Sequence, residues 1–97
     1  MIEMNIIANQ SIEEDIIEVL EARGFRDNFS LFSPLFGRGR HGRREASAIW
    51  PEKNVMFYIV MEDDQIDVLV ADLKMLKEKF EQEGIRCYVK RDISRLL

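Results

Sequence analysis

The spacing of hydrophobic residues changes along this chain from every second residue to helical spacing and back, and it does so twice. Alternation or a short continuous apolar run predicts a strand, and apolar residues at i, i+3, i+4 and i+7 predict a helix. The predicted strands are residues 2–9, 29–36, 55–61 and 85–89. One helical segment follows the first strand and another follows the third, which is the order of a split βαβ unit. The sequence therefore predicts an α+β, ferredoxin-like βαββαβ sandwich, with both helices on one face of an antiparallel four-stranded sheet.

Both predicted helices carry signals for where they begin and end. Ser11 and Glu14 have the spacing of a capping box, and Gly24 tolerates the left-handed backbone that ends many helices. Asp63 and Asp64 are predicted to supply the N-cap of the second helix and negative charge in its first turn. The stripe predicted to be buried on that helix is Ile66, Leu69, Val70, Leu73, Leu76 and Phe80.

The second and third strands differ in how they are expected to be covered. Pro34 removes one hydrogen-bond donor, so residues 29–36 are predicted at a sheet edge. Residues 55–61 are apolar except for the Tyr58 hydroxyl, which is typical of a central strand covered on both faces. Since the helices cover one face only, we expect a second copy of the chain on the other, although some monomers tolerate exposed apolar side chains. The methionines, Met75 among them, are interpreted as core residues.

The 97 residues are predicted to form a single domain, 1–97, with a long loop at 37–53. A chain of this size has a modest core, so association of copies would stabilise it. Cys87 is the one cysteine, which excludes an intramolecular disulfide and favours a reducing compartment. No apolar run is long enough for a membrane span, and we expect a cytoplasmic protein without membrane insertion.

Residues 37–44 combine three glycines and four arginines in a chain whose formal net charge is −4. Glycines let successive backbone N–H groups converge on one anion, and guanidinium groups bind phosphate or carboxylate oxygens in pairs. The segment joins two predicted strands, so it has no helix N-terminus behind it as a Rossmann or P-loop turn has. We interpret it as an anion-binding loop with no catalytic role.

Other interpretations of this loop stay open. It could be a solvated hairpin loop, although its length and the apolar Ile49 and Trp50 argue for a function. The alternative function is a nucleic-acid-binding module, in which the arginines bind phosphates and Phe32, Phe36 and Trp50 stack on bases. The acidic net charge makes nucleic acid a less favoured partner. Neither a metal site nor a catalytic group is predicted, because no nucleophile, base and orienting group can be placed together.

Three segments together resemble the nitrogen-regulatory PII proteins and their PII-like relatives. They are the Phe-Gly-Arg start of a basic loop at residues 36–42, the apolar strand at 55–60, and the acidic helix entry of Asp63 and Asp64 before residues 66–70. The resemblance covers most of the chain. It implies a homotrimeric signalling protein with an effector, possibly an adenine nucleotide, in the clefts between subunits. The loop would then engage a protein partner, such as a membrane transporter or an enzyme.

The resemblance also implies which residues meet the effector and the partner. The implied ligand-binding residues are Gly37, Arg38, Gly39, Arg40, Lys90 and Arg91. The implied partner-binding loop consists of Arg40, His41, Gly42, Arg43 and Arg44. Residues 81–85 are short and acidic where PII proteins carry a glycine- and lysine-rich loop, so Lys90 and Arg91 are the substitutes for it. The chain is therefore interpreted as a divergent PII-like protein.

Overall fold

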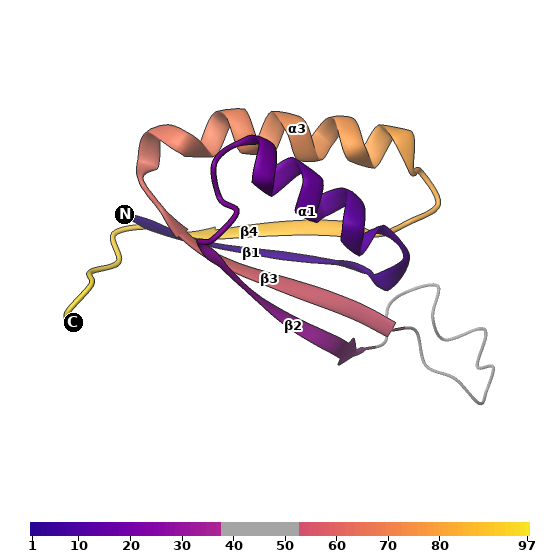
Figure 1. Cartoon of the computed structure of the whole chain (residues 1–97), viewed down its shortest axis with the longest axis horizontal. Coiled ribbons are helices and arrows are strands. Elements are labelled where there is room, and N and C mark those ends of the chain that lie inside the picture. Colours follow the sequence, from indigo (N-terminus) through magenta and orange to yellow (C-terminus); the bar gives the residue numbers. More distant parts are fainter. Residues whose placement is uncertain (38–52) are drawn as a thin grey trace.

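The computed structural model describes residues 1–37 and 53–97, which form a four-stranded sheet with two helices on one face (Figure 1). The strands are β1 (Ile2–Asn9), β2 (Phe29–Phe36), β3 (Lys53–Met61) and β4 (Ile85–Lys90), and the helices are α1 (Glu13–Ala22) and α3 (Ile66–Lys79). The strand order is β2-β3-β1-β4, and each neighbouring pair is antiparallel. The predicted α+β, ferredoxin-like fold is confirmed. Within the described ranges, no helix is long and apolar enough to cross a membrane.

The strand bounds follow the predicted ones closely. The first two strands begin and end at the predicted residues, β3 begins two residues earlier and β4 ends one residue later. β2 lies at the sheet edge, as Pro34 predicts, and its pairing with β3 shifts register between Phe32 and Leu35. The shift surrounds the residue that has no N–H to give to the ladder.

The first helix begins differently from the prediction. A short 3-10 turn, Gln10–Ile12, precedes α1, and the Asn9 side chain accepts the Ser11 backbone N–H at 2.9 Å. Asn9 rather than Ser11 therefore caps this helical segment at its N-terminus. The 3-10 turn begins directly after β1, so the first helical residue lies before Ser11. At the other end Gly24 adopts φ +87°, as predicted, and its N–H donates to the Glu21 carbonyl at 3.1 Å.

A similar 3-10 turn, Asp63–Gln65, precedes α3. The backbone N–H of Glu62 donates to Gln65 Oε1 at 3.1 Å, so the cap lies one residue before the predicted Asp63. Asp63 and Asp64 stay in the first turn, where their charges suit the helix dipole. On α3 the buried side chains are Ile66, Leu69, Leu73 and Leu76, and Val70 and Phe80 are partly buried against them.

The core lies between the helices and one face of the sheet. Alternate residues of β1 point into it, as do the odd-numbered residues 55–61 of β3. Phe57 is fully buried at its centre, and its ring centroid lies 5.5 Å from that of Phe29. Burial of these apolar side chains is the main stabilising contribution to the fold.

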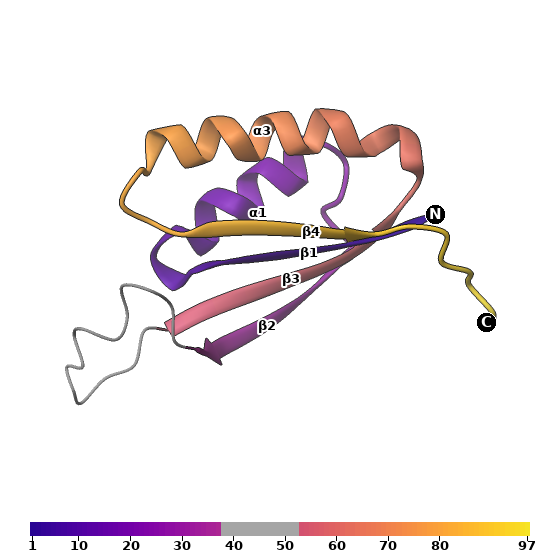
Figure 2. The ribbon, with the colours of Figure 1, turned by 180° about the vertical axis from the view of Figure 1, so that it is seen from behind.

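The opposite face of the sheet, which we call the open face, carries no helix (Figure 2). The prediction that β3 is covered on both faces is thus wrong for a single chain: Met56 and Val60 are half-buried, and Tyr58 is 36% exposed. The strand pairings place Phe32, Met56 and Ile7 in one row across this face. On β4 the row ends at Arg86, which pairs with Ile7. An apolar row of this kind is typical of a surface that contacts another protein.

Candidate ligand site

The base of the predicted anion-binding loop lies at one end of the sheet. Gly37 follows β2 directly and is exposed, beside the start of β3. A Cβ at this position would lie 3.9 Å from Asn54 Nδ2, which is ordinary van der Waals contact. The remaining predicted loop residues lie outside the described residues: Arg38, Gly39, Arg40, His41, Gly42, Arg43 and Arg44.

Lys90 and Arg91 lie at the other end of the sheet. Lys90 is the last residue of β4 rather than the first residue after it, and it pairs with Glu3, which pairs with Val60. Its Nζ is 3.8 Å from the Glu3 carboxylate. Phe36 pairs with Lys53, so the two parts of the predicted site are separated by the length of β3. Seven residues of strand span about 23 Å.

One chain therefore does not bring Gly37 and the basic residues after β4 together. A ligand that touches both must lie between two copies of the chain. The resemblance to PII proteins led to the same expectation of a site shared by subunits.

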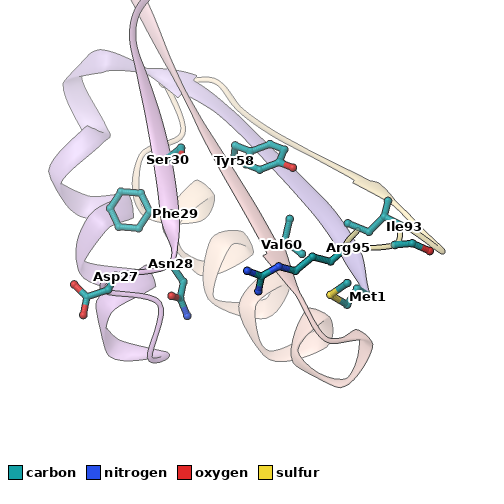
Figure 3. A pocket seen from close by; sticks show the side chains of 10 residues that line it. Met1, Asp27, Asn28, Phe29, Ser30, Tyr58, Val60, Ile93 and Arg95 are labelled. Carbon is teal, nitrogen blue, oxygen red and sulfur yellow. The ribbon is translucent and has the colours of Figure 1, made fainter. Parts of the chain in front are cut away.

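A pocket of about 590 Å³ opens at the Lys90 end of the sheet (Figure 3). We call it the tail pocket, because the segment after β4 forms one of its walls. It is lined by Met1, Asp27, Asn28, Phe29, Ser30, Tyr58, Val60, Ile93, Ser94 and Arg95. Its volume lies within the range typical of sites for small molecules and cofactors, about 300–1,000 Å³.

Two local turns position these walls. Asp92 adopts φ +57°, a left-handed conformation that aspartate tolerates, and it redirects the chain after β4. The N–H of Ile93 then donates to the Met1 carbonyl at 3.3 Å, which holds the tail beside the start of β1. On the opposite wall the N–H of Asn28 donates to the Phe25 carbonyl at 3.1 Å. Backbone hydrogen bonds thus fix both sides of the pocket.

The side chains of the tail pocket combine apolar surface with a few polar groups. Val60 and Ile93 supply apolar contacts, and the Tyr58 and Ser30 hydroxyls can donate or accept hydrogen bonds. The Phe29 ring points away from these side chains, toward the core (Figure 3).

Arg95 supplies a positively charged side chain to the pocket. Figure 3 shows its side chain extended from the tail toward β3, while the Asp27 carboxylate lies on the far side of Asn28. Arg95 Nε donates to the Leu97 carbonyl. A guanidinium group beside apolar surface suits a ligand with a flat apolar part and an anionic group.

Sequence reasoning did not find this pocket. The resemblance to PII proteins implied Lys90 and Arg91 as the basic ligand-binding residues after the last strand, whereas Arg95 lines the pocket. The signal available in the sequence was Arg95 itself, a basic residue four positions after Arg91. Its placement depends on the turn at Asp92 and on a hydrogen bond to the first residue of the chain, and local sequence patterns encode neither.

Cys87 lies among side chains of the core. It lies on the helix-facing side of β4, where it packs against the core and is half-buried. Burial raises the pKa of its thiol, which lowers the fraction of reactive thiolate.

The sequence matches no protein-family model and no curated protein. Solved structures do resemble the fold. CPII from Thiomonas intermedia K12, a nitrogen regulatory PII-like protein bound to ADP, AMP and bicarbonate, superposes with a TM-score of 0.74 at 16% identity, over 99% of this chain and 94% of its own. A PII-like signalling protein from Thermus thermophilus reaches 0.60 at 21% identity, over 92% and 83%.

A DUF3240 family protein from Shewanella baltica OS155 gives a TM-score of 0.68 at 19% identity, over 99% of this chain and 97% of its own. These three likenesses extend over nearly the whole of the chain, and identities of this size establish the fold rather than the activity. The chain therefore has the fold of the PII-like proteins.

Proposed function

We propose that the protein is a divergent PII-like regulatory protein. In this proposal it is a cytoplasmic homotrimer that binds a small anionic effector, of the adenine nucleotide class, in the clefts between its subunits. The Gly/Arg loop at residues 37–44 passes the bound state to a protein partner, such as a transporter or an enzyme. The protein itself has no catalytic role.

The separation of the two half-sites is the observation that carries the proposal. The tail pocket and Lys90 lie at one end of the sheet, and Gly37 lies at the other, about 23 Å away along β3. An assembly that places the tail pocket of one copy beside the loop base of the next completes a site with arginines on both sides. Arg95 would contribute from one copy and Arg38 and Arg40 from the other.

The open face supports self-association. Phe32 is 50% exposed there, and it continues into the row with Met56 and Ile7. In the neighbouring row Asn5 pairs with Tyr58 on one side and with Tyr88, which is 55% exposed, on the other. Contact between open faces would remove these side chains from water, with about 25 cal/mol gained per Å² of apolar surface.

The chemistry of the pocket supports an anionic ligand with an aromatic part. CPII, with which the chain shares its fold, has been seen with ADP, AMP and bicarbonate, and also with acetate. Tyr58 offers aromatic surface for a base, and Arg95 offers a paired donor for phosphate. Arginine stays protonated, so it binds an anion without exchanging protons with it.

Thermal unfolding with ATP, ADP, AMP and cyclic AMP, each with and without bicarbonate, tests the proposal. A nucleotide at one hundred times its Kd stabilises the fold by about 2.7 kcal/mol, which corresponds to a rise in Tm on the order of 10 °C. Arg95→Gln should abolish most of that rise. Arg26→Gln, which removes an exposed arginine outside the pocket lining, is the matched control and should leave it intact. Absence of any rise at millimolar ligand would refute the nucleotide proposal.

A further inference from the structure

The outer surface of the helical layer contains a groove between α1 and α3. Its volume is about 650 Å³, similar to that of the tail pocket. The groove is lined by Asp15, Glu18, Val19, Ala22, Arg23, Asp72, Met75, Leu76 and Lys79. The helices that line it, α1 and α3, lie on the opposite side of the sheet from the open face (Figures 1 and 2). Association of copies through the open face would therefore leave the groove accessible.

Part of the groove lining is apolar: Val19, Ala22, Met75 and Leu76. Met75 is 68% exposed, so its interpretation as a core residue is wrong: the buried stripe of α3 passes through Leu73 and Leu76 on either side of it. Val68 lies two turns earlier on the same side of α3 and is 45% exposed. Val19 and Ala22 of α1 continue the apolar surface across the groove. A flexible, exposed methionine is typical of surfaces that bind partner helices.

Asp15 and Glu18 make the α1 wall of the groove negatively charged, whereas Lys79 lies on the α3 wall. This helix of ten residues contains five acidic residues and no basic one: Glu13, Glu14, Asp15, Glu18 and Glu21. Arg23, which follows it, is already neutralised by Asp72, with Nε 2.6 Å and Nη2 3.0 Å from the two carboxylate oxygens. This bidentate ion pair also joins the end of α1 to α3 and so fixes the width of the groove.

We propose that the groove binds a basic amphipathic helix of a protein partner. Apolar side chains of that helix would pack on Met75, Val19 and Ala22, and lysines or arginines along its flank would face Asp15 and Glu18. Helix-in-groove recognition uses this combination of an apolar stripe and charge complementarity. The proposal is independent of the nucleotide site, because the groove and the tail pocket share no lining residue.

The test measures binding of a fluorescently labelled synthetic peptide to the full chain by anisotropy. The probe is an amphipathic helical peptide of leucine and lysine, and a second peptide carries glutamate in place of each lysine. Met75→Glu and Glu18→Lys should each weaken binding of the lysine peptide by about tenfold, the effect of removing one important contact. Two controls should change it by less than about twofold: Glu14→Lys reverses an exposed charge on α1 outside the groove lining, and Gln82→Glu adds a negative charge elsewhere. The glutamate peptide should not bind measurably.

The controls also separate the proposal from general attraction between an acidic protein and a basic peptide. Equal weakening by Glu18→Lys and Glu14→Lys would show that only net charge matters, and would overturn the proposal. So would tighter binding, with the same dependence on Met75, of a peptide that contains residues 38–52 of this chain. That result would identify the occupant as the basic loop of another copy. All four substituted positions are exposed or half-buried, and unchanged circular dichroism spectra would confirm that the variants fold.

Discussion

Met56 offers the sharpest test of whether the open face is buried in the assembled protein. It lies at the centre of that face, paired with Phe32 on β2 and with Ile7 on β1. In a single chain Met56 is only half-buried, so Met56→Lys leaves the new ammonium group in water and the fold intact. Contact between open faces would instead enclose that ammonium among apolar neighbours.

The size of the effect follows from the cost of removing a charge from water. That cost is several kcal/mol for an unpaired ion, and even about 3 kcal/mol for each of three copies would sum to about 9 kcal/mol. Since each 1.4 kcal/mol is tenfold, the association constant would fall by about a million. The nearest charged side chain in the row is Arg86, which repels lysine rather than pairing with it.

The assay is light scattering on a size-exclusion column across a range of protein concentrations, together with circular dichroism. The unmodified chain should elute with three times the subunit mass of 11.4 kDa, and Met56→Lys should elute as the single chain with an unchanged spectrum. Val68→Lys, which places the same charge on the helical side, is the control and should remain trimeric. A trimer that survives Met56→Lys would show that the open face is not the interface.

Two further predictions concern the fold itself. Phe57→Ala should lower the free energy of unfolding by about 3–5 kcal/mol in urea titrations, because it leaves a cavity beneath the helices, whereas Phe36→Ala at a 58% exposed position should cost less than about 0.5 kcal/mol. A cost below about 1 kcal/mol for Phe57→Ala would contradict this account of the core. The hydrogen bond from Arg23 lowers the pKa of Asp72, so the ion pair stabilises the fold at pH values above the unfolded pKa near 3.8, and that contribution is lost as the pH falls through the lower folded pKa. Asp72→Asn should therefore reduce the loss of stability between about pH 5 and pH 2.5. Equal pH profiles for Asp72→Asn and the unmodified chain would contradict it.

The arrangement of secondary structure could be predicted because it is encoded locally. The alternation of apolar residues in β1 indicates which face of the strand is buried, and the helical stripe of α3 does the same for that helix. Pro34 indicates an edge strand, because it has no backbone N–H to donate to a neighbouring strand. The helix starts were less predictable. Asn9, Ser11 and Glu62 can all act as caps, and the 3-10 turns that choose among them depend on how each helix packs on the sheet.

The candidate site was much less predictable than the fold. The resemblance to PII proteins implied Gly37 and Lys90 as parts of one site shared by subunits, and antiparallel pairing places them at opposite ends of the sheet in a single chain. The tail pocket depends on contacts between Ile93 and Met1, residues from the two ends of the chain, and on a single left-handed residue at Asp92. Such long-range features leave no periodic signal in a sequence, and the surface composition of α3 did not reveal that Met75 is exposed.

The length of β3 has a consequence for how mixed assemblies would behave. In the proposed assembly each subunit would carry one half-site at each end of this strand, so in a closed ring the number of complete sites would equal the number of interfaces. A subunit damaged at the tail pocket still offers an intact loop base to its neighbour, and a subunit damaged at the loop base still offers an intact pocket. Two inactive variants of opposite kinds would therefore restore a working site wherever their undamaged ends meet.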